Sequence, residues 1–480
     1  MDTHTRSTDE SPGQQERRGR GQDDPQHVPP SSGPIARTVA ASVTVGLVAA
    51  VVLVGVVFPG AGEATITGSL LVAFGLGWAV MGWASTRFAP RPLRWTRVPA
   101  AAMTATGTAL VVLSPQDAAM RTLGWMWPAP TAALAAYVWV HARRSVPWRG
   151  RWMLTPISAV LALAAVGATY ENIAVVRDQH AYAAPGSTHD VDGHELYLDC
   201  RGHGGPTVVL FNGMGEVSTN WARIVDRADT HTRVCSYDRA GQGWSGDVDR
   251  PQDGIVAAHD LHALLQQAGE HGPYVLAGHS IGGTYALTYA AQYSDEVAGM
   301  VLLDSSSPYQ FTALPAFRGQ YAMMRRGLAV MPTLARLGVG RLLNGVQPSH
   351  LPERAADVAG SLVGTARGAR NGRDEVSMLP ALFAQAQALT TLHDRPLVVL
   401  TASETREGTA GWTGAQARLA ALSTDAVQQV VDSTHAGMLE DEGPAGVSAS
   451  AIGDVVNAVR TGSAVNAVNA VNAVNAVNAR

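Results

Sequence analysis

Long uncharged apolar runs fill the first third of the chain, after a polar leading segment. Residues 1–34 are rich in Pro, Gly, Gln and charge, and this composition predicts a disordered tail. The region 35–170 then holds apolar runs close to the length, about 20 residues, that a helix needs to cross a bilayer. The predicted transmembrane helices are 36–58, 64–84, 98–113, 122–140 and 152–170. We therefore expect an all-α transmembrane region.

The third and fourth of these runs carry the weakest signal. The third is short, and the fourth contains Pro128 and Pro130. Trp125, Trp127 and Tyr137 lie near the ends of the fourth run, as aromatic side chains do at membrane–water interfaces. Buried helices of a soluble domain are the alternative interpretation, but uncharged runs as long as the first are rare in soluble cores.

Arginines alternate from one connection of this region to the next. They gather before the first run and in the second and fourth connections: Arg17, Arg18, Arg20 and Arg37; Arg87, Arg91, Arg94 and Arg97; Arg143, Arg144, Arg149 and Arg151. The first connection has none, and the third has only Arg121. Because cytoplasmic loops are the ones rich in positive charge, the N-terminal tail is expected to be cytoplasmic.

With five spans, everything after the fifth run would then lie outside. A re-entrant hairpin formed by the third and fourth runs would leave this parity unchanged, whereas the loss of one run would reverse it. We therefore expect a multi-pass protein of the cell membrane with an extracytoplasmic C-terminal domain.

A different pattern begins after 171–187, which we expect to be a linker. Over 188–460, short apolar runs with strand character alternate with helical stretches such as 255–268 and 281–293. The strand runs are 194–200, 206–212, 232–238, 273–279, 297–304 and 395–401. This alternation predicts an α/β fold with a mostly parallel sheet and helices on both faces. The tail 461–480 repeats Ala-Val-Asn, and we assign it no function.

Composition narrows the kinds of partner and cofactor. The chain has a formal net charge of −4 and contains no lysine, so its charge gives no reason to expect a nucleic-acid partner. Its two cysteines are too few for a disulfide scaffold or a four-ligand zinc site. The sequence has no metal or nucleotide motif, and we expect no cofactor.

One motif carries the candidate chemistry. The residues GHSIGG (278–283) contain G-x-S-x-G, close a strand run and open a helical stretch. In that context the serine lies on a sharp strand-to-helix turn that exposes its side chain. The N-terminus of the following helix directs backbone N–H groups toward developing negative charge. Ser280 is therefore the candidate nucleophile, and a glycine-rich turn with an idle serine is the alternative.

An acyl-transfer site also needs backbone donors for the oxyanion. The loop Asn212-Gly213-Met214-Gly215 follows the strand run 206–212. We expect the amide of Met214 to act together with the amide of Ile281, which follows the nucleophile.

Five motifs occur in a characteristic order: LFNGMG (210–215), YDRAGQGWS (237–245), GHSIGG (278–283), VLLDSS (301–306) and STHAGM (433–438). Over 188–460 the chain therefore resembles the α/β-hydrolase superfamily in its AB hydrolase-1 form. The resemblance implies the α/β-hydrolase fold with a helical cap, expected here at 305–394. It departs from the family where His-Gly is common and this chain has Asn212-Gly213, which keeps the backbone donor. A serine nucleophile argues against the epoxide-hydrolase and dehalogenase branches, which use an aspartate.

The resemblance also implies the partners of Ser280. His435 occupies the position of the family's catalytic histidine, and the order along the chain is Ser, acid, His. The acid stays open between two carboxylates. Asp304 ends the strand run 297–304, and we favour it. Glu404 follows the next strand run, which is the usual site, but it comes one position early, where Thr405 would align.

Cys200 and Cys235 fall on strand runs that are neighbours in this fold. A disulfide is plausible for a domain outside the cytoplasm, and two buried free thiols are the alternative.

The expected function is that of a membrane-anchored serine hydrolase. It would cleave an apolar, ester-type acyl substrate through an acyl-enzyme, with the bilayer as its other partner through the N-terminal helices. An acyltransferase with the same triad and an inactive membrane-tethered binding or sensor domain are the alternatives.

Overall fold

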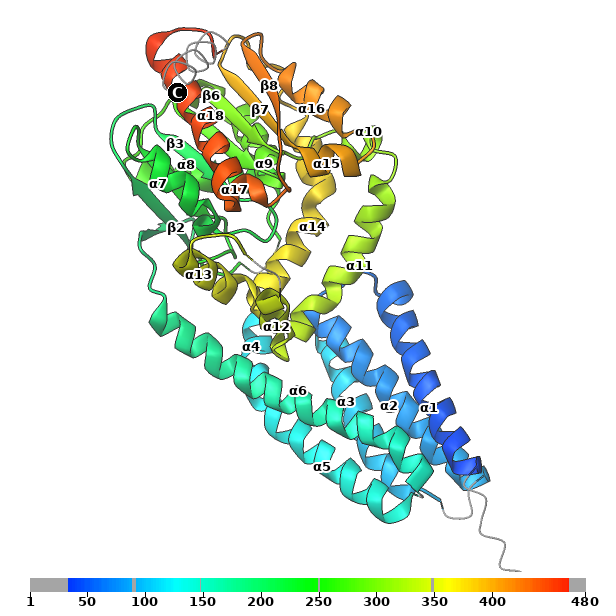
Figure 1. The fold of residues 1–480 in the computed structure, drawn as a ribbon. Helices are drawn as coiled ribbons and strands as arrows, with labels where there is room; N and C mark the ends of the chain where they lie inside the picture. Colours follow the sequence, from blue (N-terminus) through cyan, green and yellow to red (C-terminus); the bar gives the residue numbers. More distant parts are fainter. Residues whose placement is uncertain (1–32, 89–91, 147, 249–250, 347–348, 466–480) are drawn as a thin grey trace, which may run out of the picture.

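The computed structural model describes residues 33–88, 92–146, 148–248, 251–346 and 349–465 (Figure 1). The chain forms an N-terminal bundle of long helices and a C-terminal α/β domain. Most of the expected tails, 1–34 and 461–480, lies outside the described residues. Residues 33–34 belong to the first helix instead, Thr461 ends the last long helix, and 462–465 follow it.

The bundle contains long helices that run up and down along its axis. Its elements are α1 (Gly33–Val52), η1 (Leu53–Val57), α2 (Glu63–Phe88), η2 (Arg94–Thr96), α3 (Arg97–Leu113), α4 (Asp117–Met126), α5 (Pro128–Ser145) and α6 (Trp148–Ala181). Among the described residues, four helices are long and apolar enough to cross a membrane: Ile35–Val57, Glu63–Phe88, Arg94–Leu113 and Gly150–Ala181. They coincide with the first, second, third and fifth predicted spans.

The fourth predicted span, 122–140, differs from the structure. The chain forms two helices there, because α4 ends before Trp127 and Pro128 begins α5. Proline favours the first position of a helix, where its missing N–H is not needed. α5 ends in Arg143 and Arg144, so it is less apolar than the four candidate spans. Tyr137 is half-buried and its ring contacts that of Trp95 edge to face.

The expected linker 171–187 is also mostly helical. α6 continues to Ala181, and the first strand begins at Ser187. The extra turns of α6 carry Glu171 and Asp178, which both pair with Arg341 of the C-terminal domain. The helix therefore continues because this end of it packs against another part of the protein.

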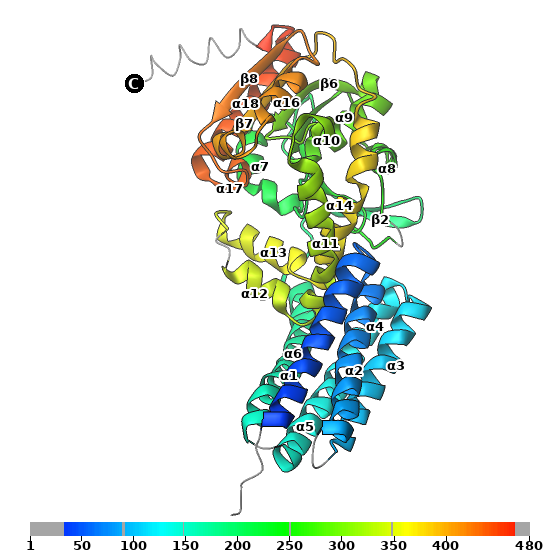
Figure 2. The ribbon, with the colours of Figure 1, turned by 90° about the vertical axis from the view of Figure 1, so that its right-hand side faces the viewer.

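The two ends of the bundle differ in which helix ends and which arginines lie there. α1 starts at the end remote from the α/β domain, and α6 leaves at the near end (Figures 1 and 2). The C-terminal ends of α2 and α5 and the N-terminal ends of α3 and α6 also lie at the remote end. The described arginines at these helix ends, including Arg87, Arg97 and Arg144, therefore gather away from the α/β domain.

An eight-stranded sheet forms the centre of the C-terminal domain. Its strands are β1 (Ser187–Val191), β2 (His194–Arg201), β3 (Val208–Phe211), β4 (Val234–Asp238), β5 (Tyr274–His279), β6 (Val297–Leu303), β7 (Leu397–Ala402) and β8 (Ala426–Val431), in the order β1-β2-β4-β3-β5-β6-β7-β8. β1 and β2 are antiparallel to their neighbours, and all other pairs are parallel. β1 is absent from the prediction, although Asp192-Gly193 at positive φ is a typical hairpin turn.

Helices cover both faces of this sheet, as the strand–helix alternation predicts. The helices outside the cap are η3 (Ser218–Trp221), α7 (Ala222–Ala228), α8 (Gly254–Gln267), α9 (Ile281–Gln292), η4 (Ser294–Glu296), α15 (Ser403–Gly408), α16 (Trp412–Ala420), α17 (Gly437–Glu440) and α18 (Glu442–Thr461). Alternate strand residues face opposite cores: Phe211 packs with α8 and α9, and Leu210 packs with α7 and α18. This alternation follows from the two-residue period of a strand.

A helical insertion between β6 and β7 forms the cap. It comprises α10 (Gln310–Ala313), α11 (Phe317–Arg336), α12 (Val339–Val346), α13 (Glu353–Val363) and α14 (Ala366–Ala386). The cap falls within the expected range 305–394. It lies between the sheet and the helical bundle (Figure 1).

Candidate active site

Ser280 lies on a strained turn between β5 and α9. Its backbone has φ 53° and ψ −126°, a region that a residue with a side chain rarely occupies. The turn needs small neighbours, because a Cβ on Gly282 would lie 2.1 Å from the carbonyl oxygen of Phe211. A Cβ on Gly283 would lie 1.9 Å from Oγ of Ser305. The geometry is that of a nucleophile elbow, with a half-buried serine at its tip.

Asp304 and His435 are in direct contact beside this turn. Nδ1 of His435 lies 2.6 Å from Oδ2 of Asp304, which is fully buried, whereas the imidazole is 40% exposed. The His435 ring also lies against the ring of His279, the residue before Ser280, with a centroid separation of 4.5 Å and a tilt of 34°. Among the described residues, no hydrogen bond joins Ser280 to His435, and such bonds often tighten only when substrate binds.

The environment of Asp304 stabilises its ionised form. Burial would raise the pKa of this carboxyl, but the hydrogen bond and charge of His435, together with the Thr405 hydroxyl, hold the pKa below its ordinary value. Oδ1 accepts hydrogen bonds from the Ala402 amide and from Nε1 of Trp412. A negative charge at this position can orient the imidazole and stabilise imidazolium.

Glu404 lies near His435 but contacts a different group. Its Oε2 accepts the backbone amide of His435 at 3.1 Å. The imidazole contact belongs to Asp304, and Thr405 donates to that carboxylate at 2.5 Å. The residue at the usual position of the acid thus supports a carboxylate from the neighbouring strand.

The loop after β3 presents the second expected donor. Gly213 donates its amide to Glu216 at 2.5 Å, and Gly215 donates its amide to Glu375 at 3.1 Å. Among the hydrogen bonds of the described residues, none uses the amide of Met214 between them. Ile281, the first residue of α9, follows the nucleophile directly. Both predicted oxyanion donors therefore lie on segments that flank the serine turn.

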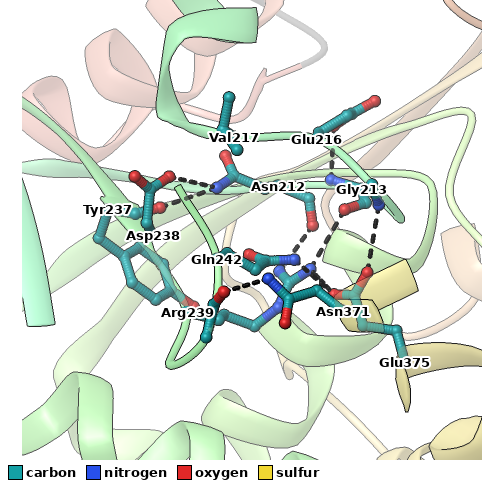
Figure 3. Close-up of polar contacts among 12 residues, drawn as sticks. Asn212, Gly213, Glu216, Val217, Tyr237, Asp238, Arg239, Gln242, Asn371 and Glu375 are labelled. Atoms are coloured by element: carbon teal, nitrogen blue, oxygen red, sulfur yellow. Dashed lines mark hydrogen bonds and ion pairs between the residues drawn. The ribbon is translucent and has the colours of Figure 1, made fainter. Parts of the chain in front are cut away.

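A buried ion pair holds this loop to the cap (Figure 3). Nη2 of Arg239 lies 2.5 Å from Oε1 of Glu375 on α14, and both side chains are buried. Arg239 also donates to the carbonyl oxygens of Asn212 and Gly213. Gln242 donates to the same carboxylate at 2.6 Å. The sequence did not predict a role for Glu375, because nothing in the cap sequence marks its contact with a loop 160 residues earlier.

A second pair of buried ionisable groups, also missed, lies behind the serine turn. Nδ1 of His279 is 2.5 Å from Oε1 of Glu216, and Nε2 of His279 donates to the carbonyl oxygen of His435 at 3.0 Å. Burial would lower the pKa of the His279 imidazole, but the Glu216 carboxylate raises it above its ordinary value. Against the effect of burial, His279 holds the pKa of Glu216 below its ordinary value. The pair connects the loop after β3, the serine turn and the His435 segment.

Asn212, which replaces the family's usual histidine, makes its own set of hydrogen bonds. Its amide nitrogen donates to the carbonyl oxygen of Tyr237, and its Oδ1 accepts from Nε1 of Trp221. These contacts fix the start of the loop from two directions.

The two cysteines face each other across paired strands. Cys200 on β2 is the register partner of Cys235 on β4, and a disulfide joins them with a Cα–Cα distance of 4.0 Å. The bridge joins β2 and β4, the second and third strands in the sheet order, whereas Ser280 follows β5.

Comparisons with known proteins agree with this fold. Residues 206–335 match the family described as alpha/beta hydrolase fold. An uncharacterized protein of Schizosaccharomyces pombe is 25% identical over 345 residues, which cover 64% of this chain and 63% of that protein. A pimeloyl-[acyl-carrier protein] methyl ester esterase of Vibrio vulnificus is 32% identical over 127 residues, 26% of this chain and 46% of the esterase. The chain thus spans less than two thirds of the length of these relatives.

The solved structures to which the chain is similar are more distant in sequence. The enol-lactonase from Burkholderia xenovorans LB400 has 20% sequence identity and a TM-score of 0.43, over 56% of this chain and all of that one. The Cif epoxide hydrolase from Acinetobacter nosocomialis has 18% identity and a TM-score of 0.47, over 60% of this chain and 95% of that one.

The strand order, the serine turn and the family match lead to one conclusion. The C-terminal domain has the α/β-hydrolase fold, its residues 206–335 match the family of that description, and it is joined to N-terminal helices apolar enough to span a membrane.

Proposed function

We propose that the protein is a serine hydrolase of ester-type acyl substrates. Oγ of Ser280 attacks the carbonyl carbon while His435 takes its proton, and Asp304 holds the imidazole in the required tautomer. The amides of Met214 and Ile281 stabilise the oxyanion. Collapse releases the alcohol with the proton from His435 and leaves an acyl-enzyme. Water, deprotonated by His435, then attacks the acyl-enzyme and releases the acid.

The observation that carries this proposal is the Asp304–His435 contact beside the strained Ser280 turn. A buried, ionised carboxylate that holds an imidazole beside a half-buried serine is the arrangement that acyl transfer needs. The 40% exposure of the His435 side chain favours water as the acceptor, and so favours hydrolysis over acyl transfer to another alcohol.

We further propose that the bundle crosses the cell membrane with the hydrolase domain outside. The arginine-rich connections at the remote end support this orientation, since cytoplasmic loops retain positive charge. Along α6, the uncharged stretch from Trp152 to Tyr170 spans about 27 Å at 1.5 Å per residue, close to the hydrocarbon thickness. A disulfide at Cys200–Cys235 is stable in the oxidising conditions outside the cytoplasm.

Activity-based labelling of the purified full-length protein tests the reaction. A fluorophosphonate probe should label the wild type and should not label Ser280→Ala. The turnover of p-nitrophenyl esters of graded chain length should be lower in Ser280→Ala than in the wild type by about 10³-fold or more. Ser294→Ala, an exposed serine of the same domain, is the matched control and should keep both signals. Full labelling of a folded Ser280→Ala protein would contradict the proposal. Product analysis with added alcohols separates hydrolysis from acyl transfer.

A further inference from the structure

The cap meets the helical bundle at a corner formed by the end of α11 and by α12. We call residues 333–346 the α11–α12 corner. It contacts two of the candidate spans, α2 and α6, and it lies at the bundle end that faces the hydrolase domain (Figures 1 and 2). Its position along these two spans can therefore be compared with the point where each becomes charged.

On α6, the corner lies inside the charged boundary. Glu171 is the first charged residue after the uncharged stretch that begins at Trp152. A Cβ on Gly167, one turn further in, would lie 2.2 Å from the carbonyl oxygen of Leu337, so the two backbones touch there. The four residues between these positions correspond to about 6 Å along the helix.

On α2, an independent contact gives the same depth. Glu63 is the last charged residue before the uncharged stretch that runs to Thr86. Oγ1 of Thr67, again one turn further in, lies 2.8 Å from Oγ1 of Thr333. Both spans thus place the corner about 6 Å inside their charged boundary, the depth at which amphipathic helices lie in a bilayer interface.

Buried ion pairs hold the corner at this level. Arg336 pairs with Glu63, and Arg341 lies 2.6 Å from both Glu171 and Asp178. Separating such buried partners would leave charges without compensation, so the corner cannot easily leave the bundle.

The face of α12 that does not contact the bundle or the rest of the cap is apolar. Arg341 turns toward α6 and Gly340 packs against Gly364, whereas Leu342 and Leu343 are 71% and 43% exposed. On α6, Tyr170 is also exposed, next to the Glu171 that pairs with Arg341. Adjacent exposed leucines are costly in water, but they continue the lipid-facing surface of the spans.

We propose that the α11–α12 corner is seated in the bilayer interface on the side of the hydrolase domain. The cap would then connect that leaflet with the active site, and the ester would be a membrane-resident amphiphile taken from the leaflet. The second part rests on the proposed hydrolase function, whereas the seating of the corner does not.

Fluorescence quenching tests the seating directly. Both native cysteines are in the disulfide, so Leu342→Cys offers a single site for an environment-sensitive dye. In nanodiscs, lipids with a nitroxide near the headgroup should quench the dye at position 342. Val430→Cys, a half-exposed apolar position on β8 far from the bundle, is the matched control and should not be quenched. Equal quenching at the two positions would overturn the proposal.

Two substrates in one vesicle preparation test the source of the ester. The wild type is assayed with p-nitrophenyl butyrate in solution and with a long-chain fluorogenic diacylglycerol ester in the bilayer. In the Leu342→Ser/Leu343→Ser protein, the rate on the bilayer ester relative to the soluble ester should fall by about tenfold, because two apolar anchors are lost. The membrane spans still hold this variant in the vesicle. A change in the ratio of the two rates therefore reports the insertion of the α11–α12 corner in the bilayer interface and not the binding of the whole protein to the membrane.

The outcomes separate the two proposals. A wild type that hydrolyses neither ester contradicts the hydrolase function, while dye quenching still decides the seating. A wild type that hydrolyses only the soluble ester, or a double variant with an unchanged ratio, overturns the membrane-resident substrate and leaves the hydrolase function intact.

Discussion

Oδ2 of Asp304 lies 2.6 Å from Nδ1 of His435, across 131 residues of chain. The same oxygen accepts the Thr405 hydroxyl at 2.5 Å, so the carboxylate is fixed as well as ionised. Glu404 instead accepts the backbone amide of His435. The two carboxylates that sequence reasoning left open are therefore in different positions relative to the imidazole.

This difference predicts unequal effects of two isosteric substitutions. Asp304→Asn should lower kcat by about 10⁴-fold, because the amide favours the wrong tautomer of the imidazole. Glu404→Gln should lower it by less than about tenfold, since an amide oxygen still accepts the backbone N–H. Steady-state kinetics on one p-nitrophenyl ester measures both. A larger loss in Glu404→Gln would transfer the role of the acid to that residue.

The Arg239–Glu375 contact predicts that the cap affects catalysis through the oxyanion loop. In Glu375→Gln, Arg239 loses its charged partner and Gly215 loses its carboxylate acceptor. We expect kcat to fall by about tenfold with KM within about twofold, because the misplaced amide of Met214 acts on charge that develops only in the transition state.

The control for this prediction is a glutamate in the same cap. Glu353 is exposed at the start of α13, and Glu353→Gln should leave kcat unchanged. Thermal unfolding of both variants shows whether the fold survives. If kcat and KM of a folded Glu375→Gln protein match the wild type, the loop does not depend on the ion pair.

The Glu216–His279 pair predicts a pH-dependent contribution to stability. The pKa of His279 is raised from 6.5, so its contribution is complete below 6.5 and is lost as the pH rises through the raised value. The pKa of Glu216 is lowered from 4.5, so its contribution is complete above 4.5 and is lost as the pH falls through the lowered value. The stabilisation is therefore greatest between these two ordinary values.

Melting curves of the wild type and Glu216→Gln measure this window. The difference in Tm should be larger at about pH 5.5 than at about pH 9, because a rise in pH removes from His279 the proton that the Glu216 carboxylate stabilises. A difference that is constant across this range would mean that the pair does not titrate with folding.

The sequence predicted most strands and the serine turn because their signals are local. The strand run 273–279 and the glycines after Ser280 carry their own pattern, and β5 and α9 follow it within one residue. The break at Trp127 also has a local signal in Pro128. By contrast, Glu375 contacts Arg239 across 136 residues and Arg336 contacts Glu63 across 273. No periodicity identifies the partner of a buried charge at such separations.

The extension of α6 is a related case. The segment 171–181 has the composition of a polar linker, but Glu171 and Asp178 lie on one helix face, where Arg341 reaches both. The ion pairs with the cap stabilise these turns as helix. Helical structure that depends on tertiary contacts cannot be predicted from propensity alone.

The last prediction concerns the orientation of the membrane region and the bridge. Ser294→Cys on the hydrolase domain should react with an impermeant maleimide in intact cells, and Thr86→Cys at the remote end of α2 should react only after permeabilisation. Both positions are exposed, so a difference in labelling reports the side of the membrane. The reverse pattern would place the domain in the cytoplasm.

The bridge itself predicts that Cys200 and Cys235 do not react with the maleimide without a reductant, because both sulfurs are in the disulfide. This disulfide closes a loop with a separation of 35 residues. Such a loop is worth roughly 3–4 kcal/mol, so reduction should also lower the Tm of the wild type, whereas free thiols would react from the start and show no such change.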